Sequence, residues 1–107
     1  MPADVRGEAR EALTDLAIAA DHPAFAGHFP GEPILPGVVL LDAALDHVCH
    51  TDGLGMHRWQ ILTAKFLKVV RPGDALRIAL ERLDGGVVRW TIRGDAGTVA
   101  SGTFGPA

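Results

Sequence analysis

The chain is poor in cysteine, and it has no long apolar run. Cys49 is the single cysteine among 107 residues, which excludes a disulfide within the chain. No apolar run approaches the roughly 18 residues that a membrane-spanning helix needs. The opening residues, MPADVRGEAREAL, lack the apolar core of a secretory signal peptide. We therefore expect no membrane association and a cytoplasmic location.

The chain also lacks an excess of basic residues. Ten Lys and Arg stand against 13 Asp and Glu, for a net charge of −3, whereas nucleic-acid binders need a clear basic excess to neutralise phosphates. The hydrophobic share of 48% is too high for a disordered chain. Residues 1–107 thus predict one folded domain, small enough that pairing with a second copy would enlarge its core.

Proline and glycine concentrate between His22 and Gly37, which favours a structured loop because proline lacks the N–H donor. The stretch from Pro36 to Thr51 predicts one helix, with proline at its first position. Its apolar residues go nearly all the way round, so we expect burial on most sides. The Ala-rich run 8–20 suits a strand or a helix, and we favour a strand.

After His57 the apolar period changes to two, which is typical of half-buried strands. The expected strands span residues 57–70, 75–83, 88–93 and 98–104. The first is long enough to contain a bulge, and turns rich in glycine or proline separate the others. The pattern predicts one helix followed by a meander of at least four antiparallel strands. A sheet that curls around a buried helix has an exposed edge where a second copy can pair.

Three residues in the loop and helix could carry chemistry. Asp42 stands among apolar residues of the helix, and burial would favour the protonated carboxyl that a general acid needs. His28 is a candidate general base, because imidazole titrates near neutral pH. Gly37 lies at the helix start, where free N–H groups can receive a carbonyl oxygen that gains negative charge. Such a set can remove a proton alpha to a carbonyl and expel a beta-hydroxyl.

Residues 27–45, GHFPGEPILPGVVLLDAAL, resemble the active-site segment of the FabA/FabZ-type 3-hydroxyacyl-[acyl-carrier-protein] dehydratases. Residues 64–80, AKFLKVVRPGDALRIAL, are similar to the strand, turn and strand of that family. The resemblance covers most of residues 12–104. It implies an α+β hotdog fold, in which a curved antiparallel β-sheet wraps around one long central helix, and a homodimer with active sites at the subunit interface.

By motif position, the resemblance makes His28 the catalytic histidine, Asp42 the catalytic acid and Gly37 the residue whose N–H polarises the thioester carbonyl. Phe29 and Pro36 are the adjoining substrate-binding positions. Because the two catalytic side chains of this family come from opposite subunits, we expect Asp42 to face His28 of the partner subunit. The resemblance implies no metal and no redox cofactor. It implies a substrate carried on the phosphopantetheine of acyl carrier protein.

The sequence departs from the family at several points. The acid is Asp, as in the FabA branch, rather than the Glu usual in FabZ. Asp46 stands four residues after Asp42, where the family usually has Gln. Two carboxylates at this spacing repel, so Asp46 either keeps one of the pair protonated or marks a diverged site. The chain has no tyrosine to gate an acyl tunnel, and Phe25 or Phe29 could take that place.

Other polar and aromatic residues have two interpretations each. The His and Cys residues near the end of the helix match no metal-binding spacing, and we expect an exposed helix end and no metal site: His47, Cys49, His50 and His57. Three basic residues could dock an acidic carrier protein or form a solvated face: Lys65, Lys68 and Arg71. Three aromatic residues belong to the core, to an interface or to a tunnel wall: Trp59, Phe66 and Trp90.

The main hypothesis is a dehydratase that eliminates water from a (3R)-3-hydroxyacyl thioester to give a trans-2-enoyl thioester, in fatty-acid or related acyl or polyene biosynthesis. Two alternatives stay open. A hotdog thioesterase would activate water with a carboxylate, although the intact segment His28–Gly31 counts against it. A non-catalytic hotdog subunit would bind acyl chains or support a partner dehydratase, and Asp46 keeps that hypothesis open.

Overall fold

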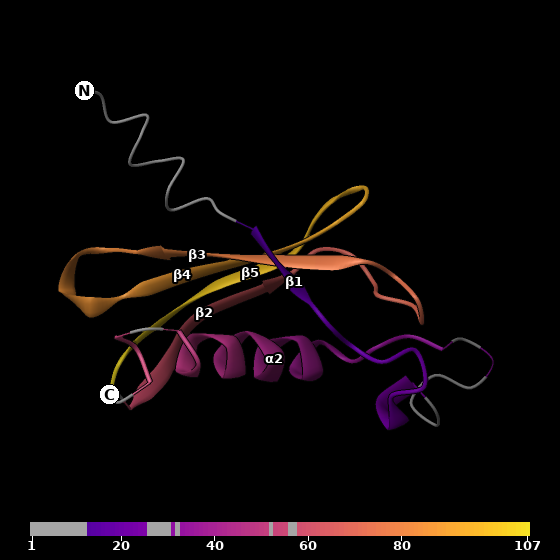
Figure 1. The fold of residues 1–107 in the computed structure, drawn as a ribbon, viewed down its shortest axis with the longest axis horizontal. Coiled ribbons are helices and arrows are strands. Elements are labelled where there is room, and N and C mark those ends of the chain that lie inside the picture. Colours follow the sequence, from indigo (N-terminus) through magenta and orange to yellow (C-terminus); the bar gives the residue numbers. More distant parts are fainter. Residues whose placement is uncertain (1–12, 26–30, 32, 52, 56–57) are drawn as a thin grey trace.

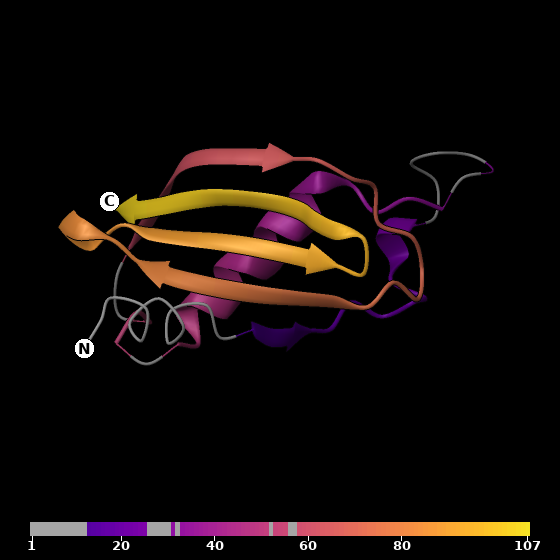
Figure 2. The same ribbon diagram turned by 90° about the horizontal axis from the view of Figure 1, so that it is seen from above.

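The computed structural model describes residues 13–25, 31, 33–51, 53–55 and 58–107. Within these residues, a five-stranded antiparallel sheet lies over one long helix, as Figure 1 shows from the side and Figure 2 from above. The strands are β1 (Leu13–Leu16), β2 (Trp59–Phe66), β3 (Leu76–Arg82), β4 (Val88–Gly94) and β5 (Gly97–Pro106), and the helix is α2 (Gly37–Cys49). Two short 3-10 turns, η1 (Pro23–Phe25) and η2 (Asp84–Gly86), complete the described elements. The expected α+β arrangement of one sheet and one helix is confirmed.

The central strands β3, β4 and β5 form the predicted meander. Their alternation explains why they form a sheet: on β4, Val88, Trp90 and Ile92 are buried while Arg89 and Arg93 are exposed. The buried side chains face α2 and make the core, in which the rings of Trp90 and Phe104 stack with centroids 5.8 Å apart. The opposite face of the sheet carries the polar side chains.

The place of β2 differs from a simple meander. The strand order is β1-β3-β4-β5-β2, so β2 pairs with β5 and not with β3, its successor in the chain. Residues 67–75 carry the chain from one side of the sheet to the other, and the turn at Pro72–Gly73 reverses it. The expected bulge is confirmed, because the register of β2 against β5 shifts between Ile61 and Thr63. The strand is shorter than expected and ends at Phe66.

The helix α2 is less buried than its composition predicts. Its buried residues are Leu40, Ala44 and Val48, which form one stripe against the sheet. Val38 is 67% exposed, and Asp42 and Asp46 are also exposed. The prediction of burial on most sides was therefore wrong for a single protomer, because one sheet can cover only one face of a helix. Because apolar residues also lie on the uncovered face, we expect a second protein surface to cover that face.

The start of α2 is defined by Pro36, which is extended (φ −62°, ψ 144°) and serves as the N-cap rather than as the first helical residue. Figure 2 shows the helix crossing beneath the sheet obliquely, so that its first turn lies near the C-terminal end of β2. Strand β1 pairs with β3 at the opposite edge and confirms the strand expected within residues 8–20. The described residues include no helix long and apolar enough to cross a membrane.

Candidate active site

The loop that precedes α2 is fixed to the segment that follows β2. The N–H of Leu35 donates a hydrogen bond of 2.9 Å to the carbonyl oxygen of Val70. Both side chains are buried in the core, at 4% and 2% exposure. This connection sets the first turn of the helix beside the end of β2, although the helix α2 and the strand β2 separate the two segments along the chain.

A groove of about 280 Å³ lies at this junction. One wall is the loop and first turn of the helix, and the other is the end of β2 with the residues after it. Its lining residues are Ile34, Leu35, Pro36, Gly37, Leu40, Phe66, Leu67, Lys68 and Val69. Two residues that the sequence singled out for substrate binding, Pro36 and Gly37, are therefore both in the groove wall.

The first turn of α2 offers backbone donors to this groove. An α-helix leaves its first N–H groups without intrahelical partners. The N–H of Val39 donates to the carbonyl oxygen of Pro36 at 3.0 Å, and the N-cap residue Pro36 has no side-chain hydrogen bond that would cap the helix start. The position of Gly37 thus combines a helix N-terminal N–H with the positive end of the helix dipole, which suits a carbonyl oxygen that acquires negative charge.

The groove is narrow at Gly37 because of Phe66. A Cβ atom placed on Gly37 would lie only 3.1 Å from Cδ1 and Cε1 of the Phe66 ring. Glycine is thus the residue that lets the strand and the helix start approach so closely. Phe66 keeps 47% of its surface exposed, and among the described residues that line this groove it is the one aromatic side chain.

Asp42 lies on the face of α2 that the sheet leaves uncovered. The expectation that its side chain is buried was wrong for the single protomer, because the apolar neighbours that suggested burial turn toward the sheet while Asp42 turns away. Asp46, one turn later, is exposed as well, so the two carboxylates share one face as their spacing predicts. Asp46 contacts His50: the Nδ1 atom of His50 lies 2.8 Å from the backbone oxygen of Asp46 and 3.5 Å from its Oδ1 atom.

His28 and Phe29 lie outside the described residues, so the structure brings together only part of the predicted set. Gly37 and Pro36 meet in the groove, and Asp42 follows on the same helix. Phe25, a suggested substitute for a gating tyrosine, is 7% exposed and belongs to the core, and it does not line the groove.

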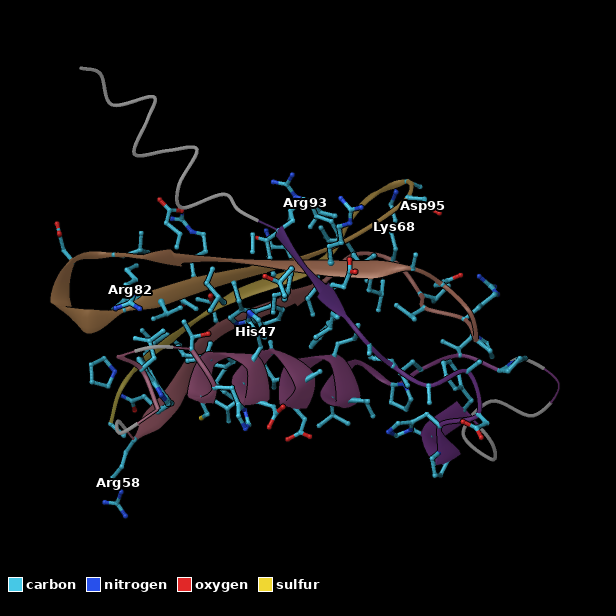
Figure 3. All side chains as sticks on the ribbon, in the orientation of Figure 1. His47, Arg58, Lys68, Arg82, Arg93 and Asp95 are labelled. Carbon is cyan, nitrogen blue, oxygen red and sulfur yellow. The ribbon has the colours of Figure 1, made fainter. Side chains whose placement is uncertain are left out.

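The three basic candidates for docking are all exposed. Lys65 is on β2, where its cross-strand partner is Ser101 of β5. Lys68 donates from Nζ to the carbonyl oxygen of Ala96 at 2.7 Å, and Figure 3 shows it with Arg93 and Asp95 at one corner of the sheet. Arg71 begins a turn in which its N–H donates to Oδ2 of Asp74 at 2.9 Å. The three residues thus follow one path from the edge strand to the turn before β3.

At the other end of α2, His47, Cys49 and His50 occupy the last turn and the C-cap, while His57 lies outside the described residues. Cys49 is a free, exposed thiol. No group of three potential metal ligands occurs among the residues that the structure describes.

Sequence reasoning missed the role of Phe66 in the groove. It grouped this residue with Trp59 and Trp90 as core, interface or tunnel wall, although the three differ: Trp90 is fully buried, Trp59 is half-buried and Phe66 is half-exposed. The available signal was the position of Phe66 in the stretch AKF, which matches a family motif, together with a glycine at position 37.

Comparisons with known proteins agree with this geometry. The family model described as ApeI-like, ApeI dehydratase, matches residues 4–103. A 3-hydroxyacyl-[acyl-carrier-protein] dehydratase FabZ of Granulibacter bethesdensis is 38% identical over 101 residues, which cover 86% of this chain and 58% of the relative. The FabZ of Chloroflexus aggregans is 39% identical over 85 residues, 71% of this chain and 59% of the relative. The chain therefore spans somewhat less than two thirds of the length of these curated relatives.

A solved structure supports the same assignment. The dehydratase heterocomplex ApeI:P from Xenorhabdus doucetiae contains a chain that superposes with a TM-score of 0.75 at 26% sequence identity, covering 90% of this chain and 86% of that chain. The sheet and helix described above are thus a hotdog fold. The extent of the family match, the sequence identity to the FabZ enzymes and the fold lead to one conclusion: the chain belongs to the ApeI-like dehydratase family.

Proposed function

We propose that this protein is a dehydratase that converts a (3R)-3-hydroxyacyl thioester, carried on acyl carrier protein, into the trans-2-enoyl thioester and water. The observation that carries the proposal is the groove at the start of α2, where the Gly37 N–H and a half-exposed apolar wall meet. A site for this elimination needs such a donor for the thioester carbonyl, a base near C2 and an acid near the 3-hydroxyl. The sequence supplies the last two as His28 and Asp42.

In the proposed reaction the thioester carbonyl accepts a hydrogen bond from the Gly37 N–H. His28 takes a proton from C2, and the electron pair of that C–H bond becomes the new C2–C3 double bond. The bond from C3 to its oxygen breaks, and Asp42 donates a proton to that oxygen, so that water leaves. Only protons move between enzyme and substrate. We therefore propose that the reaction uses neither a metal nor a redox cofactor, and that the phosphopantetheine arrives with the substrate.

The proposed active form is a homodimer joined along β2. Among the described strands, β2 lies at an edge of the sheet and pairs only with β5. Ile61 and Phe66 face the helix side, because their cross-strand partners Phe104 and Ala100 are fully buried there, yet they are 54% and 47% exposed. Val38 on the helix is also an exposed apolar residue, and a second copy that pairs with the edge strand would cover these side chains.

The dimer would also give Asp42 the covering surface and the catalytic histidine that it lacks in one protomer. The uncovered face of α2 would meet the partner, so Asp42 would leave solvent and approach His28 of the partner subunit. The dimer would hold two sites, each with a histidine from one subunit and a carboxyl group from the other. Because the relative from Xenorhabdus doucetiae is a heterocomplex, a different hotdog subunit is the second candidate for the partner position.

We propose that the acidic carrier protein docks on Lys65, Lys68 and Arg71, which are exposed along the path from β2 to the turn before β3. The groove opens beside Lys68, so a pantetheine arm that starts at this surface has a short route to Gly37.

The exposed free thiol of Cys49 suits a reducing compartment, and we place the reaction in the cytoplasm, where carrier-protein substrates would be met.

The test is an assay of the purified protein with a short 2-enoyl or 3-hydroxyacyl thioester, followed by the ultraviolet absorption of the enoyl group. We expect reversible conversion, lost in His28→Ala. Release of free thiol without change of the acyl chain would favour the thioesterase. Activity that appears only after a second hotdog protein is added would favour the supporting subunit. A double variant Lys65→Glu and Arg71→Glu, at two basic residues outside the groove lining, should raise the KM for carrier-bound substrate and leave the KM for a pantetheine thioester unchanged.

A further inference from the structure

The side chain of Phe66 is placed differently from the other aromatic residues of the sheet. It ends β2 on the helix-facing side, opposite the fully buried Ala100. Trp90 and Phe104, which face the same side, are fully buried in the core. Phe66 leaves 47% of its surface uncovered, and it does so in the wall of the groove that holds Gly37.

The ring of Phe66 lies directly against the start of α2. Its Cδ1, Cε1 and Cγ atoms are 3.1 to 3.2 Å from the Cβ position of Gly37. One part of the ring is therefore held by the helix start, while the rest borders the groove. A flat apolar group at this point leaves less room for water beside the backbone of Gly37. A hydrogen bond to a developing negative charge is stronger where water is excluded.

We propose that Phe66 is a positioning residue for the acyl thioester: its ring packs against the carbonyl end of the bound substrate and holds the thioester oxygen on the Gly37 N–H. This inference rests on the proposed function. It assigns to the ring a role beyond covering the dimer edge. The carbonyl must lie within hydrogen-bond distance of the first turn, and the ring in contact with that turn then offers an apolar surface beside it.

The experiment compares three variants, Phe66→Leu, Phe66→Met and Phe66→Tyr, in the full chain. Each is measured for kcat and KM with a short 2-enoyl pantetheine thioester, for binding of a non-reactive acyl-pantetheine amide by calorimetry, and for molecular mass in solution. Leu and Met remove the flat ring and keep an apolar side chain, and two such variants guard against one that folds poorly. Tyr keeps the ring.

We expect Phe66→Leu and Phe66→Met to lower kcat/KM and to weaken amide binding about tenfold, with the mass unchanged. Phe66→Tyr should restore both to within about twofold of the wild type. Leu13→Ala, which alters an exposed apolar residue at the opposite edge of the sheet, should change neither. A loss of activity in Phe66→Leu that follows only a loss of dimer, with normal binding in the remaining dimer, would overturn the proposal.

The binding measurement separates the two proposals. If the wild type binds the amide but converts no thioester, the dehydratase proposal fails, and the Phe66 variants still test the ring through binding. If the wild type converts the thioester and the Phe66→Leu and Phe66→Met variants match it in both measurements, only the positioning role fails. If the wild type neither binds nor converts any acyl-pantetheine compound, both proposals fail.

Discussion

The ring of Phe66 at the end of β2 and the backbone of Gly37 at the start of α2 are in contact so close that a Cβ on residue 37 would meet the ring at 3.1 Å. This contact joins the edge of the sheet to the helix at the groove. Because real Cβ contacts are rarely this short, an added methyl group must push the ring aside. The geometry of the groove thus depends on residue 37 having no side chain.

Gly37→Ala should therefore lower activity more than stability. The half-exposed ring can move by a few tenths of an ångström, and alanine is favourable in a helix by up to about 1 kcal/mol relative to glycine. We expect a change in the free energy of unfolding within about 1 kcal/mol, since the two effects oppose. The ring displaced into the groove should lower kcat/KM about tenfold or more. Thermal unfolding and steady-state kinetics check this, and a variant with wild-type kcat/KM would contradict it.

Asp42→Asn and Asp46→Asn form a matched pair, because both carboxylates are exposed on one face of α2, one turn apart. If Asp42 is the acid, its amide variant should lose roughly 100-fold or more in kcat, the usual contribution of general acid catalysis. Asp46→Asn should stay within about threefold of the wild type and remove a like-charge repulsion. Equal losses in the two variants would instead indicate that the charge of the face, and not one carboxyl group, matters.

Ile61→Lys should separate the proposed dimer. Ile61 is 54% exposed on the helix-facing side of the edge strand, where a buried lysine would be left without a partner charge. Light scattering after size-exclusion chromatography should show a monomer with little activity. Thr63→Lys is the control, since Thr63 lies on the same strand and bonds to Thr103 through its hydroxyl. A dimer that survives Ile61→Lys would place the interface elsewhere.

A mixture of two inactive variants tests whether the site is shared. His28→Ala and Asp42→Asn dimers, unfolded and refolded together, should yield exchanged dimers in which one of the two sites has both groups intact. Random exchange in a twofold dimer then restores roughly a quarter of wild-type activity. If both groups came from the same subunit, exchange would restore nothing. Refolded wild type and each variant refolded alone are the controls.

Gly102→Ala should destabilise the fold strongly. A Cβ at this position would overlap the backbone oxygen of Thr63 and lie 2.7 Å from Cζ2 of the buried Trp90. Neither the backbone of β2 nor a fully buried ring can move without loss of packing, so we expect at least about 2 kcal/mol. Ser101→Ala, next to it on the strand, should cost less than about 0.5 kcal/mol. Denaturant unfolding of the two variants measures the difference.

Much of the fold was predictable because local signals agree with it. The alternation in β3 and β4 and the run after Gly37 identified the strands and the helix to within one or two residues. The pairing of β2 with β5 was not predictable, since it depends on contacts between residues far apart in the chain. An alternating pattern says which face of a strand is buried, but not which strand lies beside it.

The site was predictable in part. The positions of Gly37 and Pro36 followed from the helix-start signals and from the family motif. The exposure of Asp42 did not, because apolar neighbours on a helix indicate burial without saying whether the covering surface is in the same chain or in another. The contact of Phe66 with Gly37 joins residues from two elements, and only the folded arrangement brings them together.

The pairing of β2 with β5 has a consequence for the order in which this molecule can form. Ribosomal synthesis releases β2 before the strand that it needs, and β3 and β4 emerge in between. The wall of the groove that Phe66 provides thus cannot be in place on a nascent chain until residues 97–106 have emerged. An arrested or shortened product without them would leave β2 unpaired and exposed, the kind of edge on which chains aggregate.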